Sequence, residues 1–487
     1  MFLGIDLGTS SVKAVLVDSS QNIVAVASHP FTVQRPYEGW SEQEPSQWLE
    51  GTVKAVRRLM ELAPAALSDV EAVGLSGQQH GAVFLDEKGR VLRPCMLWND
   101  TRSEVECGLF EARFPGCRSV LGSMVMPSFT APKVLWVARH EPEIFARTKH
   151  ILLPKAWLRY ALTGLMCEEM SDASGTAWLD IGKRNWSSEA LEATGLKKKQ
   201  MPELCEGSDR AGTLKAEYVA LWGMKKAPIF AGGAGDNAAG AMGLGAINDG
   251  DAFVSLGTSG VLWMTSSQYH PYPEAAIHTF CHALPEKWHH MGVMLSAAAS
   301  FKWWSGVSGA PETTLLAELP AEIRTPSSVL FAPYLSGERT PYNDGRVKGA
   351  FIGLSHNVTR ADLTQAVLEG VAFSFRDALE AIRKTGDVPH AADVIGGGSR
   401  SLLWTQIMAS VMNLPLYQIQ NGDQGGAFGA TRLARIALTG EDSKTVCKPP
   451  ERINLISPHE ELVQSYDDAY RRYRKLYPAL SGFRSDD

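Results

Sequence analysis

The sequence predicts an α/β fold made of two similar halves, and two observations support this prediction. An apolar run, a Gly-Thr-Ser turn and a second apolar run occupy residues 5–12, and the same pattern returns at residues 254–261, about half a chain length later. Each copy has the pattern of a β-hairpin. Strand-like runs then alternate with helix-period segments behind both copies, which is typical of an α/β chain. A duplication explains the match better than chance.

The expected elements follow from hydrophobic periodicity. We expect strands over residues 70–75, 151–154, 228–231 and 393–395, and helices over residues 48–62, 363–382 and 404–412. A last helix is expected over residues 460–477, where Tyr466, Tyr470, Tyr473 and Tyr477 share one face. The polar tail after Pro478 is expected to fray.

The length of 487 residues indicates two or three domains. The repeat places a boundary in the turn-rich stretch Asn248 to Asp251. The predicted domains are therefore residues 1–248 and residues 249–487.

Composition excludes several classes of protein. With 53 acidic and 47 basic side chains the net charge is -6, which gives no reason to expect a nucleic-acid partner. Charged residues at 21% and hydrophobic residues at 45% exclude a disordered chain. No stretch of about 20 apolar residues occurs, so no membrane partner is expected.

The cysteines and the N-terminus indicate a cytoplasmic protein. The seven cysteines are scattered and form no C-x-x-C pair, which favours a reducing compartment over a disulfide framework or a zinc ribbon. Residues 2–6 look like a strand and have no signal-peptide pattern.

The two Gly-Thr-Ser turns suit a phosphate chain. Glycine lets the backbone approach a ligand closely, and successive N–H groups and hydroxyls can then point into one concavity. Two such turns could hold one polyphosphate between them. A Walker A loop is excluded, because Gly182-Lys183 is followed by Arg184.

Three further glycine-rich turns follow apolar runs, at residues 74–81, 232–237 and 396–400. In open α/β sheets, ligands lie beyond the carboxyl ends of the strands, where such turns occur. The second turn contains Asp236, whose carboxylate could accept a proton from a substrate hydroxyl. The alternative is that Asp236 only caps the following helix, and the spacing leaves both interpretations open.

Two other chemistries fit the sequence less well. Residues 233–238 match the dinucleotide fingerprint of an NAD-dependent oxidoreductase, but the acidic residue expected about 20 positions later is missing near Ser255. His278, Cys281 and His282 resemble a metal cluster, yet an extended segment would send neighbouring side chains to opposite faces, so packing is favoured.

The motifs together resemble the FGGY carbohydrate kinases over nearly the whole chain. The resemblance lies in residues 5–10, 98–102, 171–176, 334–341 and 396–400. It implies an actin-like pair of RNase-H-type domains, with sugar and ATP bound in the cleft between them and a hinge that closes on both. It departs at residues 233–236, where Gly-Ala-Gly-Asp stands in place of three glycines before the aspartate in some relatives.

The resemblance also implies roles for individual residues. Asp236 would be the general base. Asp6 would help to hold the phosphates and, through water, Mg²⁺. The sugar would be bound by Gln79, His80, Trp98 and Asn99. The phosphate chain and adenosine of ATP would be bound by Gly8, Thr9, Ser10, Ser11, Gly257, Thr258, Ser259, Gly397, Gly398, Ser399 and Gly426.

The implied reaction is phosphorylation of D-xylulose by ATP, and Gln79-His80 stands where glycerol-specific members have Arg-Glu. Ribulose, gluconate and pentitols stay open as acceptors. The remaining alternatives are the oxidoreductase and an actin-like nucleotide switch. The expected partners are a small sugar and ATP, and a homodimer is left open.

Overall fold

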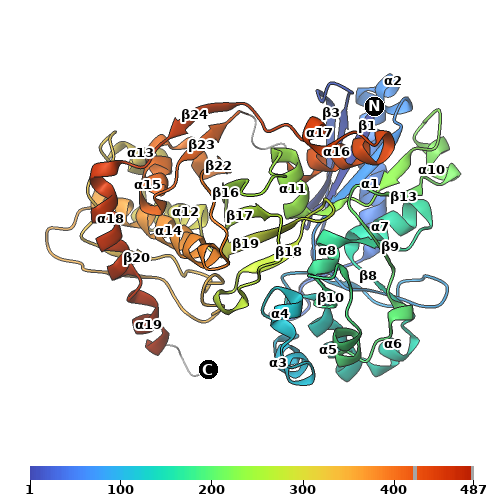
Figure 1. Ribbon diagram of the computed structural model, residues 1–487, viewed down its shortest axis with the longest axis horizontal. Coiled ribbons are helices and arrows are strands. Elements are labelled where there is room, and N and C mark those ends of the chain that lie inside the picture. Colours follow the sequence, from blue (N-terminus) through green and yellow to red (C-terminus); the bar gives the residue numbers. More distant parts are fainter. Residues whose placement is uncertain (421–424, 484–487) are drawn as a thin grey trace. The chain divides into compact units, whose positions relative to one another are not determined.

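Each half of the chain folds around a mixed, seven-stranded β-sheet (Figure 1). The computed structural model describes residues 1–420 and 425–483. The first compact unit contains Met1–Ile247, Phe280–Trp288 and Gln424–Pro449. The second contains Asn248–Thr279, His289–Asp423 and Pro450–Asp487. The chain therefore passes between the units more than once.

Both predicted hairpins form, and both stand at the same place in their sheets. Strand β1 (Phe2–Leu7) pairs antiparallel with β2 (Ser11–Val17) and parallel with β5 (Ala72–Gly77). In the second unit β16 (Ala252–Leu256) pairs antiparallel with β17 (Gly260–Ser266) and parallel with β22 (Ala392–Ile395). This shared topology confirms the predicted α/β fold and supports the duplication.

The strand orders show that the two sheets have similar topologies. The first sheet has the order β13-β14-β5-β1-β2-β3, with β15 paired to β5, and the second has the order β18-β19-β17-β16-β22-β23-β24. The bounds not yet given are β3 (Ile23–Pro30), β13 (Arg210–Thr213), β14 (Ile229–Ala231), β15 (Ala234–Gly235), β18 (His278–Cys281), β19 (Trp288–Met294), β23 (Leu416–Ile419) and β24 (Arg452–Ile456).

Helices and short strand pairs surround these sheets. In the first unit they are β4 (Glu42–Gln43), α1 (Pro45–Leu62), α2 (Pro64–Ser68), β6 (Val83–Leu85), β7 (Cys95–Met96), α3 (Glu104–Arg113), α4 (Cys117–Leu121), α5 (Thr130–His140), α6 (Pro142–Arg147), β8 (His150–Leu152), α7 (Pro154–Thr163), β9 (Cys167–Glu169), α8 (Met170–Ser174), β10 (Leu179–Asp180), β11 (Asn185–Trp186), α9 (Ser188–Ala193), β12 (Glu203–Cys205), α10 (Ala216–Leu221), α11 (Asp236–Leu244), α16 (Gly425–Thr439) and α17 (Ser443–Val446). In the second unit they are α12 (Ala298–Ser308), α13 (Glu312–Ala317), β20 (Leu330–Ala332), β21 (Ala350–Ile352), α14 (Arg360–Arg383), α15 (Leu402–Met412), α18 (Glu460–Tyr473) and α19 (Leu476–Leu480). Among the described residues no helix is both long and apolar enough to span a bilayer.

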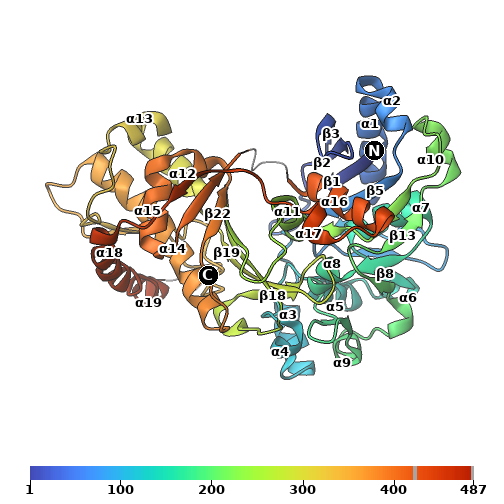
Figure 2. The ribbon, with the colours of Figure 1, turned by 45° about the horizontal axis from the view of Figure 1, so that its top comes forward.

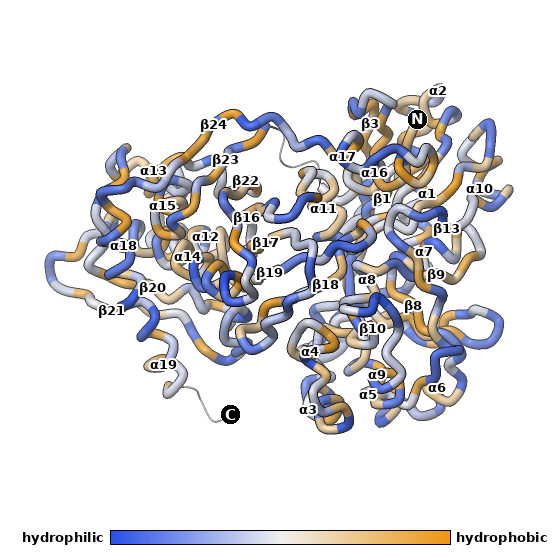
Figure 3. Tube along the Cα trace, viewed as in Figure 1, coloured by the Kyte–Doolittle hydropathy of each residue, from blue (hydrophilic) through white to orange (hydrophobic). Residues whose placement is uncertain are grey.

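The long helices form where periodicity predicts them, and local signals fix their starts. Helix α1 begins at Pro45, whose missing N–H is not needed in the first turn. Its buried residues recur at helical spacing, among them Trp48, Thr52 and Val56. Helix α14 begins after Thr359, which forms a capping box with Asp362. Hydrophobic and hydrophilic residues alternate along these helices in the trace of Figure 3.

Helix α16 lies directly on the first sheet, although it comes from the far end of the chain. Both views, in Figures 1 and 2, show it beside β1. A Cβ atom on Gly4 would stand 1.9 Å from the carbonyl oxygen of Ala427, and one on Gly74 would stand 1.9 Å from that of Ala430. Only glycine permits so close an approach of helix and strands.

The C-terminal helix is shorter than predicted. Helix α18 ends at Tyr473, and α19 begins at Leu476, so a single helix to residue 477 is wrong. Tyr466, Tyr470 and Tyr473 do share a buried face. Pro478 lies in the first turn of α19, where a missing N–H breaks no helical bond, and the helix continues past it to Leu480. Residues 484–487 of the predicted tail lie outside the described residues.

The contact between α16 and the sheet predicts a large effect of one methyl group. Gly74→Ala should lower the free energy of unfolding by about 3 kcal/mol, because its Cβ would overlap a backbone oxygen. Gly108→Ala is the control: Gly108 is in α3, and a Cβ atom there would have no neighbour within 4 Å, so alanine should stabilise the protein by about 1 kcal/mol. Urea unfolding measures both, and equal effects would contradict the proposed packing.

Candidate active site

The first sheet brings Asp6 and the turn of Asp236 to one edge. Asp6 is in register with Ser76 of β5, and Ser76 is in register with Ala234 of β15. These strands are parallel, so their carboxyl ends lie at the same edge of the sheet. Asp6 and Asp236 are far apart in sequence, and the pairing of the strands makes them neighbours.

The negative charge of Asp6 raises the affinity of the Asp236 carboxylate for a proton. Burial and then the negative charge of Asp6 raise the pKa of Asp236 to about 7, against the hydrogen bonds from Asn237. Burial also raises the pKa of Asp6, although the Ser76 hydroxyl donates to its Oδ1 at 2.8 Å. The side chain of Asp236 remains open to solvent on one side, so it stays accessible to a ligand.

The capping alternative for Asp236 is wrong. The N-cap of α11 is Gly235, and Asp236 is the first helical residue. Its Oδ1 accepts hydrogen bonds from the backbone N–H of Asn237 at 2.7 Å and from Asn237 Nδ2 at 3.0 Å. These local bonds fix the orientation of the carboxylate and leave Oδ2 for other partners.

The first Gly-Thr-Ser turn is held by side chains around it. The N–H of Gly8 donates to the carbonyl of Ser11 at 3.0 Å, which closes the turn. The Thr9 hydroxyl donates to Gln78 at 3.0 Å and accepts from the indole of Trp98 at 2.9 Å. Trp98 is 41% exposed, so its ring has one open face. Ser10 is exposed and Ser11 half-buried.

Gly426 belongs with Asp6 in the first unit. It stands in the first turn of α16, and a Cβ atom there would lie 2.4 Å from Ser76 Oγ and 3.2 Å from Asp6 Oδ1. The other residues predicted to bind adenosine, Gly397 to Ser399, belong to the second unit.

Gln79 and His80 follow β5 and are both fixed by backbone groups. Gln79 Nε2 donates to the carbonyl of Ser171 at 3.0 Å, and His80 Nδ1 lies 2.7 Å from the carbonyl of Gly175. The His80 ring stacks on Phe129 with ring centroids 4.9 Å apart. His80 has a φ of 69°, a left-handed conformation that non-glycine residues rarely adopt and that often marks a functional site.

The carbonyl of His80 is held by two side chains that the sequence did not reveal. Lys133 Nζ donates to it at 2.9 Å and Thr130 Oγ1 at 3.2 Å. Lys133 is fully buried and also donates to the carbonyl of Ser128. Burial lowers the pKa of Lys133 to about 7. A lysine within a helix looks like a surface residue, so no signal in the sequence could have found this contact.

Asn99 presents an unused acceptor. Within the described residues its buried Oδ1 has no hydrogen-bond partner. A buried polar atom without a partner is unfavourable, and a ligand hydroxyl could supply the missing donor.

A buried cluster of charges supports the segment that holds Gln79. Lys155 Nζ lies 3.4 Å from a carboxylate oxygen of each of Glu168, Glu169 and Asp172. Burial alone would lower the pKa of Lys155, but the three carboxylates outweigh it and raise the pKa. Glu169 caps α8 by accepting from the N–H groups of Ser171 and Asp172. The Ser171 hydroxyl in turn accepts from the N–H of Gly235 at 3.1 Å.

These three carboxylates are close enough to hold a metal ion, but the Lys155 ammonium already stands as a cation 3.4 Å from each of them. For the segment around His278, the structure favours the predicted packing over a metal cluster. His278 and Cys281 are buried in the extended strand β18. His282 Nδ1 accepts from the N–H of Leu284 at 3.1 Å, and burial lowers its pKa to about 3, so it is neutral.

In the second unit the predicted nucleotide turns lie next to each other. The N–H groups of Ala297 and Ala298 donate to the carbonyls of Thr258 and Gly257 at 3.0 and 2.8 Å, and Thr258 and Ser259 are exposed. A Cβ on Gly396 would stand 3.0 Å from the N of Gly257, and one on Gly398 would stand 2.6 Å from the Leu256 side chain. The Ser399 hydroxyl donates to the carbonyl of Gly396 at 2.7 Å.

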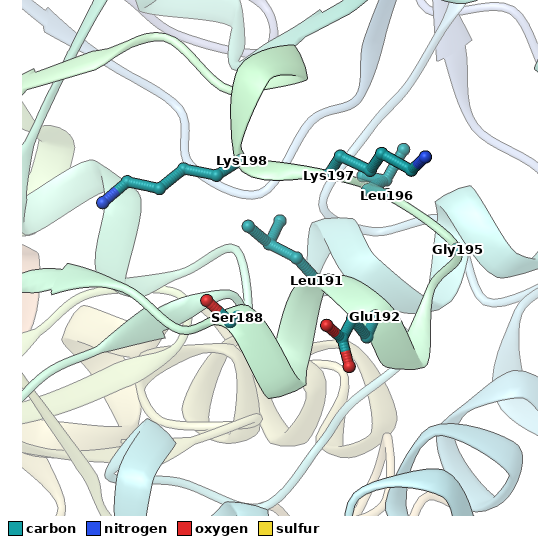
Figure 4. A pocket seen from close by; sticks show the side chains of 7 residues that line it. All are labelled: Ser188, Leu191, Glu192, Gly195, Leu196, Lys197 and Lys198. Atoms are coloured by element: carbon teal, nitrogen blue, oxygen red, sulfur yellow. The ribbon is translucent and has the colours of Figure 1, made fainter.

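A separate hollow on the first unit contains none of the predicted residues (Figure 4). Its cavity volume is about 400 Å³, and its lining residues are Ser188, Leu191, Glu192, Gly195, Leu196, Lys197 and Lys198. Its charged lining residues, Glu192, Lys197 and Lys198, are all exposed.

Comparison with known proteins finds similar sequences and similar folds. The N-terminal domain of the FGGY family of carbohydrate kinases matches residues 1–243, and the C-terminal domain of that family matches residues 252–438. A xylulose kinase of Escherichia coli (strain K12) is 45% identical over 486 residues, which cover 99% of this chain and 99% of that protein. A crystal structure described as a xyloylose kinase from Brucella ovis is 52% identical, covers 99% of both chains and has a TM-score of 0.96. A xylulose kinase from Rhodospirillum rubrum is 27% identical, covers 99% of both chains and has a TM-score of 0.90.

The backbone conformation of His80 predicts that a glycine variant is more stable than an alanine variant. At a φ of 69° glycine is unstrained and alanine is strained, so His80→Ala should unfold about 1 kcal/mol more easily than His80→Gly. Both variants lose the imidazole, so the comparison isolates the backbone. Urea unfolding measures the difference. If the alanine variant were the more stable one, His80 would not hold this conformation in solution.

Proposed function

The chain belongs to the FGGY family of carbohydrate kinases, and from this premise we propose that it transfers the γ-phosphoryl group of ATP to D-xylulose. The products are D-xylulose 5-phosphate and ADP. The observation that carries the proposal is the Asp236 carboxylate, which is solvent-accessible, has a pKa near neutrality and lies at the edge where β1, β5 and β15 end. The similarity to xylulose kinases over nearly their full length supports the choice of sugar.

Asp236 acts as the general base in this proposal. Its carboxylate takes the proton of the terminal sugar hydroxyl while that oxygen attacks the γ-phosphorus in line with the leaving ADP. A base with a pKa near the working pH is substantially ionised and still binds a proton well. The Asn237 bonds to Oδ1 hold the carboxylate in place during the transfer.

The oxygen ligands beside Asp236 fit a magnesium ion. Mg²⁺ prefers carboxylate and water ligands, and the repulsion that the charge of Asp6 exerts on the Asp236 carboxylate favours a cation near them. We propose that Asp6 holds Mg²⁺ through water, and the ion would neutralise charge on the phosphates when bound. The Ser76 hydroxyl orients the Asp6 carboxylate toward that task.

The sugar contacts are proposed for Gln79, His80, Trp98 and Asn99. Backbone carbonyls engage Gln79 Nε2 and His80 Nδ1, so both side chains are held in a fixed orientation before a ligand binds. The indole N–H of Trp98 donates to Thr9, so the face of its ring is the part proposed to contact the sugar. The unused Oδ1 of Asn99 suits a sugar hydroxyl, and a site that pairs each hydroxyl discriminates strongly against sugars that lack one.

We propose that the two halves of the chain bind different ligands. Residues 1–248 bind the sugar and, through Gly8 to Ser11, part of the phosphate chain. Residues 249–487 bind the nucleotide through Gly257 to Ser259 and Gly397 to Ser399, and Gly426 stands beside Asp6. The backbone N–H groups and hydroxyls of the two turns are the groups that suit phosphate oxygens.

A cytoplasmic location is also proposed, supported by the cysteine usage. A homodimer is the oligomeric form to test first, and sedimentation of the purified protein distinguishes it from a monomer.

The function is tested by measuring ADP release with ATP and a panel of D-xylulose, ribulose, gluconate and pentitols. The proposal requires the highest kcat/KM for D-xylulose. ADP release that does not depend on any sugar would overturn it and favour a nucleotide switch.

Replacing the base should abolish turnover without unfolding the protein. Asp236→Asn should lower kcat by about 10²-fold to 10⁴-fold, while ATP affinity stays within a few fold. Asp18→Asn is a matched control, because Asp18 is also a turn carboxylate bonded to a neighbouring asparagine, and it should leave kcat unchanged. Steady-state kinetics and calorimetric ATP titration provide the measurements. Retention of more than about a tenth of the activity would show that Asp236 is not the base.

The pH profile should report the titration of Asp236. A general base works when deprotonated, and its pKa is raised to about 7, so kcat/KM for D-xylulose should rise with pH and reach half its maximum near pH 7. The rate is measured from pH 5 to 9 with saturating ATP. A profile that is flat between pH 5.5 and 8 would contradict the raised pKa.

A further inference from the structure

Two cysteines of the first unit lie against each other. The Sγ atoms of Cys167 and Cys205 are 2.7 Å apart, and both thiols are free. Their strands β9 and β12 are parallel neighbours, with Cys167 opposite Glu203 and Cys205 opposite Glu169. A disulfide needs an S–S distance of about 2.0 Å, so a small movement would join them.

The surroundings make the two sulfurs chemically unequal. The hydrogen bond between the two sulfurs, together with the positive charge of Arg159, lowers the pKa of Cys167 to about 7 against the effect of burial. The same hydrogen bond and burial raise the pKa of Cys205. A large share of Cys167 is therefore thiolate at neutral pH, and Cys205 is the thiol that can respond to it.

The other cysteines lack this environment. Burial raises the pKa of each of them, which keeps them as unreactive thiols: Cys95, Cys107, Cys117, Cys281 and Cys447. Cys167 is itself only 4% exposed, but Cys205 is half-buried, so a small oxidant can reach the pair from that side.

We propose that Cys167 and Cys205 form a reversible redox site that a peroxide converts to a disulfide. The Cys167 thiolate attacks one peroxide oxygen, the O–O bond breaks, and Cys167 becomes a sulfenic acid while hydroxide (or an alkoxide, from an organic peroxide) leaves. The Cys205 sulfur then attacks the sulfenic sulfur, the S–O bond breaks, and the Cys205 proton leaves with that oxygen as water. The sulfurs together lose two electrons and the peroxide gains them. A dithiol restores both thiols by exchange.

The pair is directly connected to the turn that bears Asp236. Arg159 donates to the carbonyl of Cys167 and, at 2.6 Å, to the carbonyl of Gly232. Beyond the end of β12, the carbonyl of Gly207, two residues after Cys205, accepts at 3.0 Å from the N–H of Gly233. A disulfide that draws β9 and β12 together moves both supports of this turn. An effect on turnover rests on the proposed function, whereas the disulfide itself does not.

The test uses the full-length chain treated with hydrogen peroxide and digested with trypsin under non-reducing conditions. Residues 160–183 and 200–210 are tryptic peptides with one cysteine each. The expected result is a disulfide-linked pair of these peptides, loss of two free thiols per chain, and recovery of both thiols with dithiothreitol. Cys107→Ser is the matched control and should leave the linked pair unchanged, because Cys107 is also half-buried but has a raised pKa.

Absence of the linked pair in the wild-type protein, with oxidation spread over other cysteines, would overturn the proposal. Cys205→Ser should instead stop at sulfenic or sulfinic acid on Cys167. In the kinase assay, kcat of the oxidised wild type should fall several fold and return on reduction. A linked pair with unchanged kcat would overturn the effect on turnover. A linked pair in a protein that phosphorylates no sugar would overturn the proposed function and leave the proposed redox site standing.

Discussion

The close contact between helix α16 and strands β1 and β5 is the constraint on which the site depends. Gly4 and Gly74 let the helix backbone touch the strands, and Gly429 gives the same approach toward Ala239 of α11. These contacts bring a segment near residue 425 to the edge where the first hairpin ends. They place Gly426 beside Ser76 and Asp6, so the chemistry of that edge is built from the beginning, the middle and the end of the chain.

That edge combines groups with opposed electrostatic effects. Asp236 is the first residue of α11, where the helix dipole and the Asn237 bonds favour a charged carboxylate. Burial and the charge of Asp6 oppose them and prevail, which moves the pKa of Asp236 to about 7. A second negative charge near the Asp236 carboxylate is unfavourable in the protein alone, and a cationic ligand or a transferable proton relieves the repulsion. The arrangement therefore suits phosphoryl transfer better than it suits structural stability.

The sequence was sufficient for the fold and for the membership in the FGGY family, because the hairpins, the glycine-rich turns and the long amphipathic helices all have local signals. It correctly indicated extended packing around His278. It failed at the C-terminal helix, where the tyrosine spacing continues past the break between Tyr473 and Leu476. It also missed Ser76, Thr130, Lys133 and Lys155, because their importance comes from strand register and from neighbours distant in sequence. The capping alternative for Asp236 could be rejected only from the helix geometry.

The two buried lysines of the first unit show how the site is kept rigid. Lys155 is surrounded by three carboxylates and keeps its charge, whereas Lys133 donates to carbonyl oxygens, and burial lowers its pKa to about 7. Each supports the segments around Gln79 and His80, Lys133 directly through the His80 carbonyl and Lys155 through Glu169 and Ser171. Buried charges are unfavourable unless their partners are fixed, so loss of one contact would leave another group unpaired. Water cannot replace these partners where no solvent reaches. The left-handed conformation of His80 is thus maintained before any sugar binds, which is the pre-organisation that selective recognition of hydroxyl groups requires.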